Sequence, residues 1–176
     1  MDISYKHIAR AKLEAQKAIF EFDGDYRFLS NFGDGEVVMY GITFPTVEHA
    51  FAAAKLDPNG GVHPRAEVVE EMHKIAAEPT PGLAKKSGRR RTWNGRPFMR
   101  ADWDEIKLDL ITELVRRKFQ NPDLAAKLLA TGDALLVEGN TWRDRTWGMV
   151  EKVGVFEGKN MLGEILMKIR AELRAN

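Results

Sequence analysis

Residues 44–55 read FPTVEHAFAAAK and predict a helix that carries two ionisable side chains. Pro45 and Thr46 form a helix start signal, so we expect a helix from Val47 to Lys55. On a period of about 3.6 residues, Glu48 and Lys55 lie two turns apart on one face of that helix. The predicted helix therefore presents a carboxylate and an amine toward the same side.

The flanking sequence predicts an α+β fold, a single helix-rich domain around a small β-sheet. Residues 36–44 predict a hairpin around Tyr40-Gly41. Upstream, we expect a lead-in helix over Tyr5 to Lys17 and a short strand over residues 19–22. The downstream elements are a helix over 62–76, a helix from a capping box at Asp102 and Glu105 to Phe119, a helix from Asn121-Pro122 to 131–132, a buried strand over 135–137, an irregular stretch over 139–158, and an amphipathic helix capped by Asn160. We see no convincing domain boundary.

The composition excludes several protein classes. The 176 residues are 44% hydrophobic and 30% charged, with 27 Lys+Arg against 26 Asp+Glu, which excludes disorder, collagen and a long coiled coil. The absence of cysteine excludes a disulfide scaffold, a zinc-thiolate site and a thiol nucleophile. No apolar run is long enough to span a membrane, and the first residues lack a secretory apolar region, so we expect a cytoplasmic protein without a membrane partner.

Positive charge is concentrated in one stretch that contains no acidic residue. Its cations are Lys85, Lys86, Arg89, Arg90, Arg91, Arg96 and Arg100. Because guanidinium groups bind phosphate bidentately, this stretch favours anion binding. The alternative is a solvated loop that balances the acidic residues between Glu67 and Glu78.

The chemistry-bearing residues are carboxylates, one lysine and tryptophans. The common hydrolase and nucleotide motifs are absent, and the four histidines show no metal-ligand spacing, so we expect no metal site. Glu48, Glu138 and Asp144 lie where side chains can project into a cleft, although each is also explained by a cap or a surface salt bridge. Trp147, in a loop, is favoured as a ligand contact, whereas Trp103 at a helix start is more easily explained as core.

Short motifs along most of the chain then resemble the NADAR (YbiA-like) family. They are Phe28-Leu29-Ser30-Asn31-Phe32, Phe44 to Phe51 with Lys55, Gly88-Arg89, Trp103, Lys118-Phe119, 128–132, 136–138, Trp147-Gly148 and 158–163. Each block is short, but their joint order and spacing are specific. The resemblance implies a family domain over 19–176 behind an N-terminal helical lead-in over 1–18.

The resemblance also implies an N-glycosidase that uses no cofactor. Some members act on phosphoribosylamino intermediates of riboflavin synthesis, and others remove ADP-ribose from guanine, including as antitoxins to a DNA-modifying toxin. The expected catalytic residues are Glu48 and Lys55, which match the family motifs, and Asp144, which lies in an irregular loop from which its side chain can project into a cleft. The substrate-binding residues are Ser30, Asn31, Phe32, Arg89, Trp103, Glu138, Trp147, Gly148 and Asn160. Lys55 then either stabilises a phosphorylated substrate or attacks the anomeric carbon as a Schiff-base nucleophile, and Glu138 is either structural or catalytic.

Three functions follow from the resemblance and the charge pattern. The cationic stretch favours hydrolysis of the bond between ADP-ribose and guanine in nucleic acid, with a cognate ADP-ribosyltransferase toxin encoded nearby as a possible partner. The second is hydrolysis of a small phosphoribosylaminopyrimidine, and the third a non-catalytic module that binds ADP-ribose or NAD. Departures from the family pattern are a longer connection over Leu56 to Ser87, where we expect substrate preference to change, and Met149-Val150 in place of a Gly-rich turn.

Overall fold

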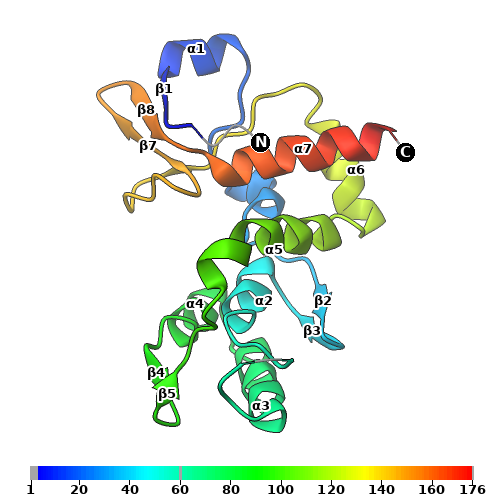
Figure 1. Ribbon diagram of the computed structural model, residues 1–176. Coiled ribbons are helices and arrows are strands. Elements are labelled where there is room, and N and C mark those ends of the chain that lie inside the picture. Colours follow the sequence, from blue (N-terminus) through cyan, green and yellow to red (C-terminus); the bar gives the residue numbers. More distant parts are fainter. Residues whose placement is uncertain (1–3, 60, 176) are drawn as a thin grey trace. The chain divides into compact units, whose positions relative to one another are not determined.

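The computed structural model describes residues 4–59 and 61–175, and its helices and strands are drawn in Figure 1. The chain forms two compact units: a terminal unit, made of the residues up to Ser30 and those from Asn121 onward, and a central unit, Asn31–Gln120. Both units mix helices with short strands, so the predicted α+β class is confirmed. No helix within 4–59 and 61–175 is long and apolar enough to cross a membrane.

The central unit is built around a short, buried helix. Its elements are the strands β2 (Val37–Met39), β3 (Ile42–Phe44), β4 (Thr92–Trp93) and β5 (Arg96–Pro97), and the helices α2 (Val47–Ala53), α3 (Arg65–Ala76), α4 (Pro81–Ser87) and α5 (Trp103–Lys118). Helix α2 contacts α3, α4 and α5 (Figure 1). Its alanines are small, so its neighbours can approach closely, and Val47, Ala50 and Ala53 are fully buried.

The terminal unit contains the only four-stranded sheet among the described residues. Its elements are β1 (Lys6–Ala9), α1 (Arg10–Ala15), the 3-10 helix η1 (Gly24–Leu29), α6 (Pro122–Ala130), β6 (Gly139–Asn140), β7 (Met149–Lys152), β8 (Val155–Gly158) and α7 (Met161–Ala175). The strand order is β1-β8-β7-β6, and only the β6–β7 pair is parallel. Leu13, Val137, Met149 and Phe156 form the core cluster of this unit.

Several local predictions are confirmed. The predicted hairpin is β2–β3, with positive φ at Tyr40 (52°) and Gly41 (77°), as a two-residue hairpin turn requires. The Asn121 side chain accepts hydrogen bonds from the Asp123 and Leu124 amides and caps α6. The helices predicted over 62–76 and after Asn160 are α3 and α7.

Four predictions about local structure are wrong or incomplete. The lead-in expected over Tyr5 to Lys17 is helical only in α1, because Lys6–Ala9 pairs with β8 as β1. The stretch 139–158, expected to be irregular, contains β6, β7 and β8. The strands expected over 19–22 and 135–137 are reduced to one isolated bridge between Ile19 and Leu136. Helix α4, which was not predicted, begins at Pro81 because the Thr80 side chain accepts from the Leu83 amide.

Three predicted helix ends also differ. Helix α2 stops at Ala53, so Lys55 lies in the turn that follows rather than on the helix. The capping box at Asp102 does not form, because the Asp102 carboxylate accepts from Arg100 Nε (2.6 Å) and Nη2 (2.9 Å) and makes no cap bond. Asn160 precedes α7, but its side chain bonds the backbone of residues 136 and 138 instead of capping the helix.

Candidate active site

Lys55 is held in one orientation by a carbonyl and an indole ring. Its Nζ donates to the Gly88 carbonyl oxygen at 2.8 Å and lies 5.6 Å from the centroid of the Trp103 ring. Trp103 is 7% exposed and packs on Phe51, with the ring centroids 4.9 Å apart. Because both partners are fixed by packing, the amine is positioned rather than freely rotating.

The surroundings of Lys55 favour its uncharged form. Burial lowers the pKa of the Lys55 amine, and the neighbouring charges of Arg89 and Lys85 lower it further, while the Glu48 carboxylate opposes this change. Glu48 lies in the first turn of α2, is 9% exposed, and its backbone amide donates to the Asn31 carbonyl at 3.0 Å. The predicted proximity of Glu48 and Lys55 is therefore seen in their electrostatic interaction, although Lys55 lies beyond the helix.

The Gly88-Arg89 motif has a packing reason. A Cβ at position 88 would lie 2.9 Å from the Ala52 Cβ and 3.0 Å from the Ala52 Cα. Only glycine lets the end of α4 lie this close to α2. That close approach is what brings the Gly88 carbonyl within hydrogen-bond distance of Lys55.

Some cations of the stretch from Lys85 to Arg100 bond carboxylates or backbone carbonyls, and others form no ion pair with a described carboxylate of the central unit. Arg90 bonds the Glu71 carboxylate, and Arg100 pairs with Asp57 and Asp102. The Arg96 guanidinium donates to the Val62 carbonyl. Within the described residues of the central unit, no carboxylate forms an ion pair with Lys85, Lys86, Arg89 or Arg91. Of these four, Lys85 and Arg89 are the two whose charges act on Lys55.

The N-terminal motif lies partly beside this cluster. Phe32 is half-buried, and the Lys85 Nζ lies 5.2 Å from the centroid of its ring. Asn31 contributes its carbonyl to the start of α2. Ser30, 9% exposed, belongs to the terminal unit, where its amide donates to the Arg27 carbonyl.

In the terminal unit, predicted site residues fix a loop. The Asp144 Oδ1 accepts from the Thr146 and Trp147 amides, both at 2.9 Å, and the Asp144 amide donates to the Asn140 Oδ1 at 2.9 Å. A Cβ at Gly148 would lie 2.2 Å from the Glu138 carbonyl oxygen, so glycine is required there. These contacts make the loop after β6 a rigid platform that carries Asp144 and Trp147.

Asn160 fixes the backbone on either side of Val137. It is 2% exposed and adopts a positive φ of 55°. Its Oδ1 accepts from the Glu138 amide at 3.0 Å, and its Nδ2 donates to the Leu136 carbonyl at 2.8 Å. Both ends of the amide are thus engaged by the fold, and Glu138 is positioned through its backbone.

The predicted site residues therefore fall into two groups. The central unit gathers Glu48 and Lys55 with Arg89, Trp103, Asn31 and Phe32. The terminal unit holds Ser30, Glu138, Asp144, Trp147, Gly148 and Asn160. The roles of the individual residues stay predictions.

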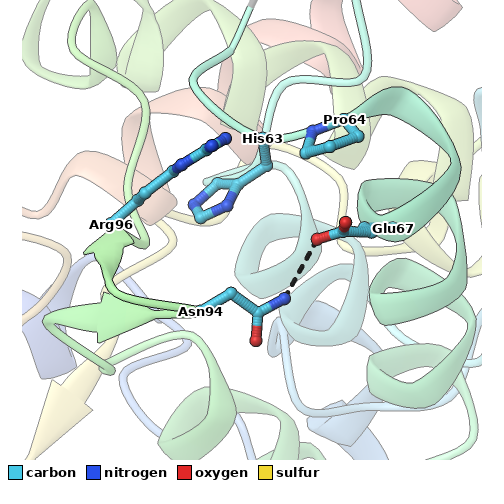
Figure 2. A pocket seen from close by; sticks show the side chains of 5 residues that line it. All are labelled: His63, Pro64, Glu67, Asn94 and Arg96. Atoms are coloured by element: carbon cyan, nitrogen blue, oxygen red, sulfur yellow. Dashed lines mark hydrogen bonds between the residues drawn. The ribbon is translucent and has the colours of Figure 1, made fainter.

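A small polar pocket lies elsewhere in the central unit and contains no predicted site residue. Figure 2 shows its lining by His63, Pro64, Glu67, Asn94 and Arg96, with Asn94 donating to Glu67 at 3.0 Å. The His63 Nε2 donates to the Pro97 carbonyl at 2.8 Å, which fixes the ring. The pocket lies partly in the long connection over Leu56 to Ser87, where we predicted a change in substrate preference.

Sequence reasoning missed two contributors to the Lys55 cluster. Lys85 was counted in the cationic stretch but not among the site residues. Its place one helical turn before Gly88-Arg89 is the signal that identifies it. The Gly88 contribution is a backbone carbonyl, for which the sequence contains no signal beyond the glycine itself.

Comparison with known proteins decides the family. The model of the NADAR domain matches residues 19–174, nearly the whole chain. The chain belongs to the NADAR family.

The proteins that this chain is similar to include one named as an N-glycosidase. N-glycosidase YbiA of Escherichia coli is 36% identical over 151 residues, which cover 85% of this chain and 82% of that protein. A riboflavin biosynthesis protein of Vibrio vulnificus is 33% identical over 156 residues, and this chain spans 38% of its length. The NMR structure of E. coli YbiA matches with a TM-score of 0.67 and 32% identity, covering 90% of this chain and 86% of that one. The predicted enzyme class, an N-glycosyl hydrolase, is confirmed at the level of the family.

Proposed function

We propose that this NADAR protein hydrolyses the N-glycosidic bond of a small phosphoribosylamino heterocycle of the kind found in riboflavin synthesis. The observation that carries the proposal is Lys55, an amine with a lowered pKa beside Glu48, Arg89 and Lys85. The names of the relatives from Vibrio vulnificus and from Zea mays, both riboflavin biosynthesis proteins, support this substrate class.

Arg89 and Lys85 suit the phosphate of such a substrate. Neither forms an ion pair with a described carboxylate of the central unit, so their charges are available to an anion. A guanidinium binds phosphate bidentately and an ammonium adds a point charge. Two cations are enough for one phosphate, and Arg90 and Arg100 are already paired with acidic residues.

Lys55 and Glu48 suit the bond-breaking steps. In the ring-opened substrate, where an imine joins the heterocyclic nitrogen to C1′, the Lys55 amine adds to C1′ and a proton passes to the departing nitrogen. The bond from C1′ to that nitrogen breaks, which releases the heterocyclic amine and leaves a Lys55 imine. Water then adds to C1′ and the bond to Nζ breaks, releasing ribose 5-phosphate and restoring the amine. Glu48 is the proposed proton carrier in both halves.

Asp144 has a different proposed role. One of its carboxylate oxygens already accepts two backbone amides of its own loop. We therefore propose that it orders the loop that carries Trp147, and that its part in proton transfer is secondary. Turnover by the variants Asp144→Asn and Asp144→Ala separates these roles, because asparagine keeps an oxygen acceptor for the two amides.

Borohydride trapping tests the covalent step. The full chain is incubated with a phosphoribosylaminopyrimidine and borohydride, and the Lys55 peptide is analysed by mass spectrometry. We expect a reduced ribosyl phosphate adduct that is absent in Lys55→Ala. Turnover without an adduct would leave Lys55 an electrostatic role, and no turnover of this substrate would refute the proposed substrate class.

The second candidate substrate is ADP-ribosylated guanine in nucleic acid. Exposed Lys86 and Arg91 favour it, because they supply more positive charge than one phosphate needs. The same incubation with an ADP-ribosylated oligonucleotide tests it: regenerated unmodified DNA and a steep loss of binding with salt support this substrate. Binding of ADP-ribose without turnover of either substrate would support the binding-module alternative. A toxin partner and a cytoplasmic location stay predictions.

A further inference from the structure

Glu78, between α3 and α4, is bonded to both α2 and α4. Its backbone carbonyl lies 3.0 Å from the His49 Nε2, and since a carbonyl only accepts, the ring nitrogen donates. Its carboxylate accepts from the Ser87 hydroxyl at 2.8 Å. The other ring nitrogen of His49 is 2.8 Å from the Thr46 hydroxyl, so the imidazole is fixed at both ends. We call His49, Glu78 and Ser87 the clasp.

The clasp acts on the end of α4, which meets Lys55. Ser87 is the last residue of α4, and the next residue is Gly88, whose carbonyl accepts from Lys55 Nζ. Arg89 follows, and Lys85 lies in the last turn of the same helix. One helix end therefore carries three groups that act on Lys55: a hydrogen-bond acceptor and two positive charges.

The contact between Gly88 and Ala52 does not by itself fix the position of this helix end. The contact of Gly88 with Ala52 limits how closely α4 approaches α2, but contacts between small apolar groups resist sliding only weakly. Hydrogen bonds are directional, and the clasp adds two: His49 on α2 donates to the Glu78 carbonyl, and Ser87 on α4 donates to the Glu78 carboxylate. Together they set the register of α4 along α2.

We propose that Glu78 is a positioning residue for Lys55, which it orients by holding the end of α4 against α2. The inference rests on the proposed role of Lys55 in the reaction. It assigns no contact between Glu78 and the substrate. In the family motif, His49 then serves as the anchor of this clasp on α2 rather than as a proton carrier.

Opening the clasp changes Lys55 in a predictable direction. When the end of α4 moves away, Lys55 regains water and the charges of Arg89 and Lys85 recede, so the pKa of its amine rises toward the ordinary lysine value. Loss of the hydrogen bond to the Gly88 carbonyl would by itself lower the pKa of Lys55, but water replaces the carbonyl as the acceptor. Glu48 and the Trp103 face stay in place on α2 and α5, so the net change is a rise.

Matched variants test the proposal on the full chain. Glu78→Ala and Ser87→Ala each remove the side-chain bond of the clasp, whereas Glu78→Gln and Ser87→Thr keep an acceptor or a hydroxyl there. Glu70→Ala is the control for losing a carboxylate, because Glu70 is an exposed α3 residue that pairs with Lys74 at 2.7 Å. The double variant Glu78→Ala/Ser87→Ala tests coupling, since both single changes break the same bond.

Two readouts are needed. The first is competitive labelling of amines over a pH series, in which the fraction of modified Lys55 peptide reports the pKa of Lys55 without any substrate. The second is kcat and KM for the phosphoribosylaminopyrimidine. A displacement of about 1 Å costs up to about a hundredfold in rate, so we expect kcat to fall by about ten- to a hundredfold in both alanine variants.

The labelling result decides the proposal even if the proposed substrate is wrong. The proposal is supported if the pKa of Lys55 is higher in Glu78→Ala and Ser87→Ala and close to the parent value in Glu78→Gln, Ser87→Thr and Glu70→Ala. The double variant should then raise the pKa of Lys55 no more than either single variant does. An unchanged or lower pKa of Lys55 in both alanine variants overturns the proposal. So does an equal rise in Glu70→Ala, which would show that the rise does not depend on the clasp.

Discussion

Replacing Asn160 tests whether one buried amide holds the terminal unit together. The change Asn160→Ala removes the acceptor of the Glu138 amide and the donor of the Leu136 carbonyl. Leaving a buried polar group without its partner costs about 1–3 kcal/mol, and the two losses give about 2–6 kcal/mol. Alanine at a φ of 55° adds about 1 kcal/mol or more. Since domains are stable by only about 5–15 kcal/mol, this single change should remove much of the total.

Asn160→Asp separates the hydrogen bonds from the backbone conformation. Aspartate tolerates a positive φ and keeps an oxygen for the Glu138 amide, but at neutral pH it turns an acceptor toward the Leu136 carbonyl. We therefore expect Asn160→Asp to be destabilised about as much as Asn160→Ala at neutral pH. Because a protonated carboxyl donates like the amide, its deficit should shrink as the pH falls.

Urea unfolding provides the measurement. Free energies of unfolding are obtained by linear extrapolation for the parent and both variants, at neutral and mildly acidic pH, with the slope m compared between them. If Asn160→Asp is as stable as the parent at neutral pH, the positive φ and not the amide explains the asparagine. A loss below about 1 kcal/mol in Asn160→Ala would refute the whole argument.

Three further predictions concern the central unit. Gly88→Ala should lose about 1–3 kcal/mol of stability in urea unfolding, because the new methyl group meets Ala52. Adding Ala52→Gly should recover part of this loss. If Gly88→Ala loses no stability, α4 moves freely over α2. Arg89→Gln should move the acid limb of the pH profile of kcat/KM to higher pH, because removing this positive charge raises the pKa of Lys55. If the acid limb stays at the same pH, the Lys55 amine is not the titrating group. Hydrogen bonds from Arg117 and Arg116 lower the pKa of Glu113, so the stability it contributes is present above the ordinary Glu range and is lost as pH falls through its lowered pKa. Glu113→Gln should therefore lose less stability than the parent over that acidic range in a pH series of unfolding midpoints.

Local signals predicted the elements that depend on neighbouring residues. The hairpin turn at Tyr40-Gly41 and the Asn121 cap each use groups within a few residues. Strand β1 could not be found in this way, because its register pairs Lys6 with Gly158 across most of the chain. The failure at Asp102 has a different cause: a guanidinium two residues away competes for the carboxylate that the capping pattern assigns to the helix.

The candidate site was predictable where side chains carry it. The spacing of Glu48 and Lys55 predicted their proximity, and their electrostatic interaction agrees, although α2 ends before Lys55. The acceptor of Lys55 was not predictable, because it is a backbone carbonyl brought in by α4, an element that sequence reasoning missed. The seven cations were recognised as a cluster, but which of them are paired depends on Glu71 and Asp57, which lie outside the stretch.

The family motifs combine two kinds of residue, and the structure separates them. Gly88 and Gly148 are explained by the close approach of other atoms, and both ends of the Asn160 amide bond the backbone. These residues would be required even if the protein bound nothing. Arg89 is different, because it forms no ion pair with a described carboxylate of the central unit and its charge lowers the pKa of Lys55. Lys85, which lies outside the motifs and over the Phe32 ring, lowers the pKa of Lys55 in the same way. Lys55 is therefore the residue at which we expect the reaction to occur. Some of the residues around it shift its pKa, and others fix its position.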